Sequence, residues 1–188
     1  MSGDGGERRI ASNSSSSWAS QRHQARELAL QVLFEADFSG KAVDAILERR
    51  IAEEPRTPPV ASYARELAFG VRERQAEYDE TIARLAPTWP LEQMARIDRN
   101  ILRLAMYEML HSPQVPMRAA INEAVELAKQ FGSEASRRFI NGVLGTVAAA
   151  HRNASPEDPL DGQDARPEEP RDVADPDGQR PAVAPGEQ

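Results

Sequence analysis

Three basic side chains lie close together near the start of the first strongly periodic segment: Arg22, His23 and Arg26. Arg22 and Arg26 are four residues apart, so a helix would place them on one face. Such a pair could bind the phosphates of RNA, and the positive end of a helix dipole would help. The same residues could instead form the solvated face of an amphipathic helix, because Glu27 and Glu35 follow in the same segment. The pattern alone leaves both interpretations open.

A second group combines charge with an aromatic ring: Arg137, Arg138 and Phe139. Arginines beside an aromatic ring can hold an unstacked RNA base by stacking and charge. Phe139 also continues the apolar spacing of Ile140 and Val143, so it could equally be a core residue. A buried ring and a ring at the edge of an RNA-binding surface are therefore both compatible with the sequence.

The remaining polar residues indicate neither an active site nor a metal site. Asn122, Glu123 and Glu126 could be taken for acid–base groups, but the sequence offers no partner that would separate their pKa values. There is no cysteine, and the three histidines are far apart with no H-E-x-x-H spacing. We therefore expect no enzymatic activity, no metal and no cofactor.

The charge is distributed unevenly along the chain. The net charge of −7 comes mostly from the residues after His151, which include 10 acidic and 4 basic side chains against 20 and 19 in the rest. The remainder is close to neutral, so local patches should decide what it binds.

Composition also divides the chain into three parts. Residues 1–19 are rich in Gly and Ser, and residues 151–188 are acidic and rich in Pro; both lack the apolar content of a core and should be disordered. The folded domain should span 20–150. No apolar run approaches the roughly 18 residues of a membrane span, and no secretory signal pattern is present, so we expect a cytoplasmic protein.

Within 20–150 the apolar residues repeat with the period of a helix, which predicts an all-α fold of about seven helices with short connections. Ser20 is the expected N-cap of the first helix, which should end near Gly40. The segment 98–110 is apolar on most sides and should be a central buried helix, with the acid Glu108 outside the core. The first five expected helices span roughly 20–39, 42–53, 60–74, 77–86 and 98–110. The last two lie within 116–147 and are joined at Gly132.

Four stretches of sequence together resemble one family. They are QARELALQVLF at 24–34, NILRLAMYEML at 100–110, NEAVELAK at 122–129 and FINGVLG at 139–145. In this order they resemble the NusB transcription antitermination factors over about residues 21–147.

The resemblance implies a fold of two three-helix sub-bundles and no enzymatic activity. It implies binding of the boxA element of single-stranded nascent RNA together with NusE, a small-subunit ribosomal protein. The pair would help to assemble an antitermination complex on RNA polymerase, chiefly in ribosomal RNA operons.

The resemblance also implies roles for individual residues. The arginine-rich first helix of the family corresponds to Arg22, His23 and Arg26, and its other RNA-facing positions correspond to Phe34, Arg138 and Phe139. Glu92 and Asp98, around the start of the central helix, are the candidates for the NusE-facing surface.

Two other functions compete with antitermination. Glutamine and histidine interrupt the arginines of the first helix, so a protein-binding helical scaffold with weak or lost RNA binding stays an alternative. A NusB-like domain of an RNA cytosine-5 methyltransferase is disfavoured, because that enzyme needs a catalytic cysteine and a further large domain. Broad apolar helix faces would also permit a homodimer.

Overall fold

The computed structural model describes residues 6–87 and 89–154, and side chains from Trp18 onward. This part of the chain is all-α, as predicted, with seven helices and no strand. The helices are α1 (Gly6–Ser39), α2 (Val43–Glu53), α3 (Pro58–Glu73), α4 (Gln75–Leu85), α5 (Arg96–His111), α6 (Met117–Phe131) and α7 (Ser136–Ala154).

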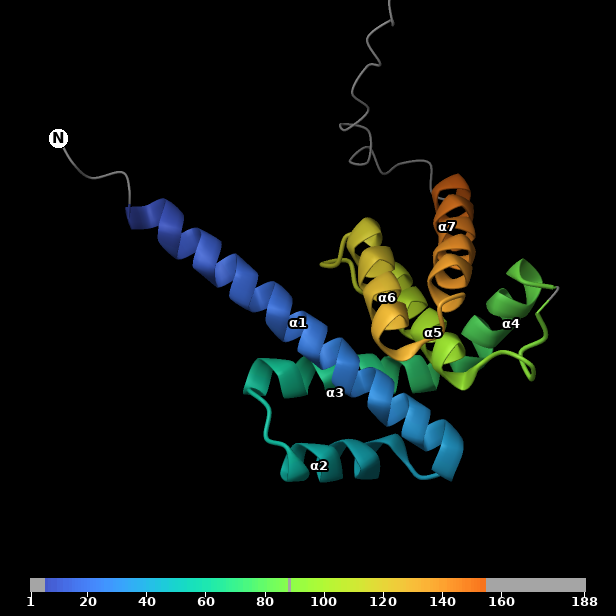
Figure 1. Ribbon diagram of the computed structural model, residues 1–188, viewed down its shortest axis with the longest axis horizontal. Coiled ribbons are helices and arrows are strands. Elements are labelled where there is room, and N and C mark those ends of the chain that lie inside the picture. The colour runs from blue at the N-terminus through green and yellow to red at the C-terminus, as the bar shows by residue number, and fades with distance from the viewer. Residues whose placement is uncertain (1–5, 88, 155–188) are drawn as a thin grey trace, which may run out of the picture. The chain divides into compact units, whose positions relative to one another are not determined.

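The helices pack in two groups of three. Helices α1, α2 and α3 contact one another, and so do α5, α6 and α7, while α4 packs on α5 and α7. Helices α1 and α3 also pack against α5 and thereby join the groups (Figure 1). This confirms the two expected three-helix sub-bundles.

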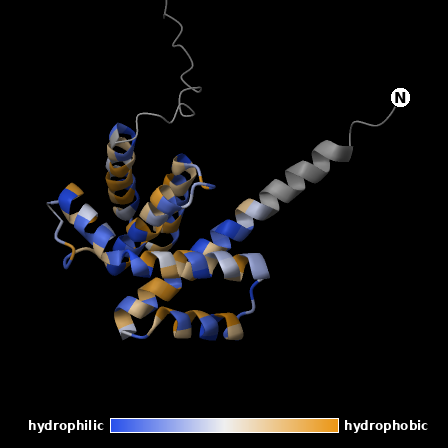
Figure 2. Cartoon of the chain, turned by 180° about the vertical axis from the view of Figure 1, so that it is seen from behind, coloured by the Kyte–Doolittle hydropathy of each residue, from blue (hydrophilic) through white to orange (hydrophobic). Residues whose placement is uncertain are grey.

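Helix α5 is the central buried helix that the sequence predicted. Ile101, Leu102 and Met106 are completely buried, and apolar faces of the other helices turn toward the interior (Figure 2). The expectation that Glu108 lies outside the core is wrong, since its side chain is only 1% exposed. A charged partner from another helix makes this burial possible, as described below.

Local sequence signals fixed several helix ends. Gly40 follows α1 with a φ of +68°, a left-handed conformation that glycine adopts without strain, and its N–H donates to the Ala36 carbonyl. Pro58 opens α3, where a missing N–H costs nothing. Before α7, the Ser136 hydroxyl accepts from the Ser133 N–H, which resembles a capping box.

The start of α1 differs from the expectation. The helix begins at Gly6 and continues through Ser20, so Ser20 is not an N-cap, and the expected Gly/Ser-rich arm over 1–19 overlaps α1 from residue 6. Residues 7–19 contain neither proline nor glycine, and extending an existing helix is much easier than nucleating one. The expected tail over 151–188 overlaps α7, which includes residues 151–154. Residues 1–5 and 155–188 lie outside the described residues.

Candidate nucleic-acid interface

Arg22 is held between two aromatic rings. Its guanidinium carbon lies 4.3 Å from the ring centroid of Trp18 and 4.2 Å from that of Tyr63, and its Nη1 donates to the Tyr63 hydroxyl at 3.1 Å. Trp18 itself is 53% exposed. Arg22 is half-buried and has no ion pair in the described part of the chain, so its positive charge remains available beside an exposed ring.

Arg26 has a different environment, although it lies one turn further along the same helix. It is only 4% exposed, and its Nε donates to both carboxylate oxygens of Glu108, at 3.0 and 2.9 Å. Its Nη1 lies 3.3 Å from Glu123, and the Tyr63 hydroxyl donates to Glu108. These contacts join α1 to α3, α5 and α6.

The burial of this cluster shifts two of its pKa values. Burial disfavours the charged Arg26 guanidinium, but the hydrogen bond and the charge of Glu108, with Glu123 and Tyr63, outweigh it and raise the pKa of Arg26. Burial, and then the Glu108 charge, raise the pKa of Tyr63. Arg26 is thus a buried structural cation, and the expectation that it shares a solvent-facing surface with Arg22 is wrong.

His23 lies at the edge of the same cluster. Its Nδ1 is 2.8 Å from a Glu123 carboxylate oxygen and its Nε2 is 3.5 Å from Glu27. One third of the His23 side chain is exposed. It therefore borders the surface beside Arg22 and connects α1 to α6.

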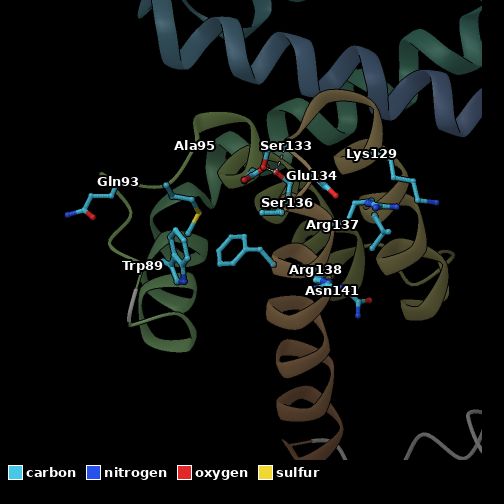
Figure 3. A pocket seen from close by; sticks show the side chains of 15 residues that line it. Trp89, Gln93, Ala95, Lys129, Ser133, Glu134, Ser136, Arg137, Arg138 and Asn141 are labelled. Carbon is cyan, nitrogen blue, oxygen red and sulfur yellow. Dashed lines mark hydrogen bonds between the residues drawn. The ribbon is translucent and has the colours of Figure 1, made fainter.

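A groove of about 1200 Å³ lies between the segment that follows α4 and the start of α7. Figure 3 shows Trp89 and Gln93 on one side of it, Lys129 and Arg137 on the other, and Ser133 and Ser136 between them. Apolar, neutral polar, cationic and anionic side chains line the groove. They are Trp89, Gln93, Met94, Ala95, Asp98, Val125, Lys129, Ser133, Glu134, Ala135, Ser136, Arg137, Arg138, Phe139 and Asn141.

Phe139 is neither fully buried in the core nor fully exposed at the surface. Its ring is partly buried against the core, and its centroid lies 5.9 Å from that of Trp89 with the planes tilted by 52°. Trp89 is 57% exposed. Arg138 is exposed and has no ion pair in the described residues. The structure therefore brings Arg138 and Phe139 to one groove with an aromatic neighbour.

The two acidic candidates are not equivalent. Glu92 is exposed, whereas Asp98 is 8% exposed and lines the groove. The Oδ1 atom of Asp98 is buried without a hydrogen-bond partner in the described residues. Burial raises the pKa of Asp98, although a hydrogen bond from Ser136 acts in the opposite direction. Asp98 therefore faces the groove rather than an open surface.

Phe34 is exposed on α1, away from both groups in sequence. Phe38, one turn later, is the most exposed large apolar residue in the described part of the chain, and the Arg96 guanidinium lies 5.6 Å from its ring centroid. Two exposed phenylalanines on neighbouring turns form an apolar strip near the start of α5. Such a strip is more typical of a protein-binding surface than of an RNA surface.

Three residues of these surfaces, Trp18, Phe38 and Trp89, were missed from the sequence. Trp18 falls in a stretch expected to be disordered, and Trp89 lies between two prolines where no helix positions it. The available signal was position, because both tryptophans stand outside the apolar stripes of the expected helices. In the structure both are at least half exposed, which is unusual for so large an apolar side chain.

Within the described residues, no group of His, Cys, Asp or Glu side chains could hold a metal ion. No helix there is long and apolar enough to cross a membrane.

Comparison with known proteins gives one family. The model of the NusB family matches residues 23–149. The transcription antitermination protein NusB of Chloroflexus aggregans is 48% identical over 144 residues, which cover 74% of this chain and 96% of that protein.

Solved structures agree. The NusB structure of T. maritima superposes with a TM-score of 0.64 at 34% identity and covers 68% of this chain and 90% of that one. A chain from the complex of antitermination factors NusB and NusE with dsRNA has the same fold, with a TM-score of 0.64 at 24% identity, covering 69% of this chain and 97% of that one. Because the family model matches more than half of the chain and a relative at 48% identity is covered over 96% of its length, the chain belongs to the NusB family.

Proposed function

We propose that the protein is a transcription antitermination factor that binds boxA-type single-stranded RNA together with NusE, within an antitermination complex on RNA polymerase. Its membership in a family of antitermination proteins is the observation that carries this proposal. One structure with the same fold contains NusB and NusE in complex with double-stranded RNA, which supports NusE and RNA as the two classes of partner. The work of such a factor is binding, carried out in the cytoplasm, and requires no catalytic residue.

The RNA-binding surface that we propose comprises Arg22, His23, Arg138 and Phe139. Arg22 and Arg138 support it because neither cation is neutralised by an ion pair in the described residues. Arg22 lies over the exposed ring of Trp18, and Arg138 lines the same groove as Trp89 and Phe139. Arg26 is left out, since Glu108 and Glu123 already occupy its guanidinium.

For NusE we propose the surface around the start of α5. Glu92 supplies an exposed acid there, and the exposed rings of Phe34 and Phe38 supply apolar area nearby on α1. An apolar centre with a charged rim is the usual composition of a protein interface. Phe34, expected to face RNA, fits this surface better.

A salt titration tests the RNA surface. Each phosphate contact contributes roughly 0.7 to the slope of log K against log salt for single-stranded RNA. The double variant Arg22→Ala, Arg138→Ala should weaken binding of a boxA-type RNA and lower that slope by about 1 to 1.5 units. Arg72→Ala, which removes an exposed arginine on α3, is the matched control and should leave the slope unchanged.

The alternative function is a helical scaffold that binds protein and not RNA. The half-buried position of Arg22 and the loss of Arg26 from the surface are the observations in its favour. It predicts that NusE binds with normal affinity while RNA affinity is weak and insensitive to both arginines. Measuring both affinities on the same preparation separates the two functions.

A further inference from the structure

The geometry points to a site for a single nucleobase in the groove between Trp89 and the start of α7, where Asp98, a buried residue of the lining, selects a base that carries an amino group. This inference rests on the proposed RNA binding and adds to it a position, two further residues and a base preference.

The first support is the aromatic wall. Trp89 and Phe139 touch at a centroid distance of 5.9 Å, and more than half of the Trp89 surface is open to solvent. The described residues leave that surface uncovered although it borders a groove large enough for a base. Bases of any sequence can stack on such rings.

The second support is charge. Arg137 and Arg138 are exposed on the first turn of α7 and have no ion pair in the described residues. Lys129 also lines the groove, although it pairs with Glu126, and Glu134 is the only acid of the lining besides Asp98. Two unpaired arginines at the groove favour a ligand with phosphates over one that is cationic.

The third support is the unpartnered oxygen of Asp98. Its side chain is more than nine-tenths buried and lines the groove, and Oδ1 receives no hydrogen bond in the described residues. A buried acceptor without a partner costs free energy that a donor from a ligand would recover. The amino groups of cytosine, adenine and guanine are such donors.

Together these groups give the site a preference. A base stacked on Trp89 can direct its amino group toward Asp98 while its phosphate remains near Arg137 or Arg138. Uracil carries carbonyl oxygens on both sides of its single N–H, and a carboxylate repels them. Cytosine and adenine should therefore bind better than uracil.

Tryptophan fluorescence tests the stacking step. In a Trp18→Phe background, Trp89 is the only tryptophan of the chain, so its emission reports on the groove alone. Titration with oligo(C) or oligo(A) RNA should quench it. In the protein that keeps Trp18, Trp89→Ala should weaken RNA binding about 5- to 150-fold, the range for one stacked base. Trp89→Phe, which keeps an aromatic ring, should bind RNA nearly as tightly as the wild-type protein.

Base preference tests Asp98. Wild-type protein should bind oligo(C) and oligo(A) more tightly than oligo(U) of equal length, and Asp98→Asn should reduce this difference because an amide can both donate and accept. Asp44→Asn is the matched control: it makes the same substitution at an exposed aspartate of α2 that lies outside the groove lining, so it should leave the preference intact.

The outcomes distinguish this site from the proposed function. If wild-type protein binds RNA but Trp89 emission, Trp89→Ala and Asp98→Asn all have no effect, the groove site is wrong and RNA binding stands. If wild-type protein binds no RNA in the presence of NusE, both are wrong. Thermal melting of each variant checks that it is folded; the exposure of Trp89 makes loss of the fold an unexpected result.

Discussion

At the scale of the residue, the two arginines of the first helix show how neighbouring positions can differ in role. Arg22 stacks between two rings near the surface, whereas Arg26 lies inside, paired with Glu108. Helical spacing of four residues puts side chains on one face within about 40°, which is enough for one to border solvent and the other the core. The positive charge of Arg26 and its hydrogen bonds therefore compensate for the burial of the Glu108 carboxylate.

Removing Arg26 should therefore destabilise the fold rather than only weaken RNA binding. Arg26→Ala would leave the Glu108 carboxylate buried without its cation, a change that typically costs about 3 to 5 kcal/mol. Urea denaturation should show a lower midpoint for Arg26→Ala and little change for Arg22→Ala. Replacing both charges, as Arg26→Met with Glu108→Gln, should cost much less than Arg26→Ala alone; an equal or larger loss would contradict this account of the pair.

Asp98 should make stability depend on pH in a direction opposite to that of an ordinary ion-paired acid. Its pKa in the folded protein is raised above the ordinary 3.8, so the ionised form is disfavoured in the fold. The resulting penalty is present above the folded pKa and disappears as pH falls below 3.8. Asp98→Asn should thus raise the melting temperature near pH 7, with a gain that shrinks to nothing in acid.

Glu92→Gln is the control for this pH series. Because Glu92 is exposed, replacing it with the neutral glutamine should change the melting temperature little at any pH. A lower melting temperature for Asp98→Asn at neutral pH would mean that the hydrogen bond from Ser136 matters more than desolvation.

At the scale of the element, the sequence predicted what depends on local signals. Gly40 and the prolines near residues 55–59, 87–90 and 113–116 set helix ends, and the apolar period identified α5 as central. The pairing of Arg26 with Glu108 could not be predicted in this way, because 82 residues separate them and only tertiary packing brings them together. The groove depends likewise on Trp89 and Phe139, which come from different elements.

Gly70 shows a tertiary requirement at an ordinary helical position. A Cβ atom added there would lie 2.0 Å from Cε2 of Tyr107, so α3 and α5 approach each other closely at this point. Gly70→Ala should force the Tyr107 ring or the helix to move and destabilise the fold by roughly 1 to 3 kcal/mol. The gain in helix propensity, at most about 1 kcal/mol, is too small to offset this.

Gly142→Ala is the matched control for Gly70→Ala. It is also a glycine inside a helix, but a Cβ there meets nothing within 4 Å. The substitution should stabilise the fold by about 0.5 to 1 kcal/mol through helix propensity alone. Chemical denaturation of both variants should give shifts of opposite sign, and shifts of the same sign would show that Tyr107 does not constrain Gly70.

At the scale of the whole molecule, α1 joins the two sub-bundles through polar contacts as well as apolar packing. Near its middle, Arg26 reaches Glu108 of α5 and Glu123 of α6. Near its C-terminal end, Asp37 accepts from Arg103 of α5 at 2.9 Å, and Arg103 also donates to Asp79 of α4. Another arrangement of the helices that kept Arg26 or Arg103 buried without these partners would leave a buried charge unpaired, which is strongly unfavourable.

This arrangement leads to the last prediction, that residues 20–150 fold without the flanking segments. Every buried apolar residue of the described chain lies between Ala25 and Ala148. The ion pairs of Arg26 with Glu108 and of Arg103 with Asp37 lie within the same range. A chain shortened to 20–150 should melt within a few degrees of the full-length protein. Its helical circular dichroism should decrease only in proportion to the number of helical residues removed from the ends of α1 and α7. Separate chains spanning 1–150 and 20–188 would locate any larger loss. A marked drop for the second would mean that Trp18, stacked on Arg22, stabilises the domain and does not only serve its surface.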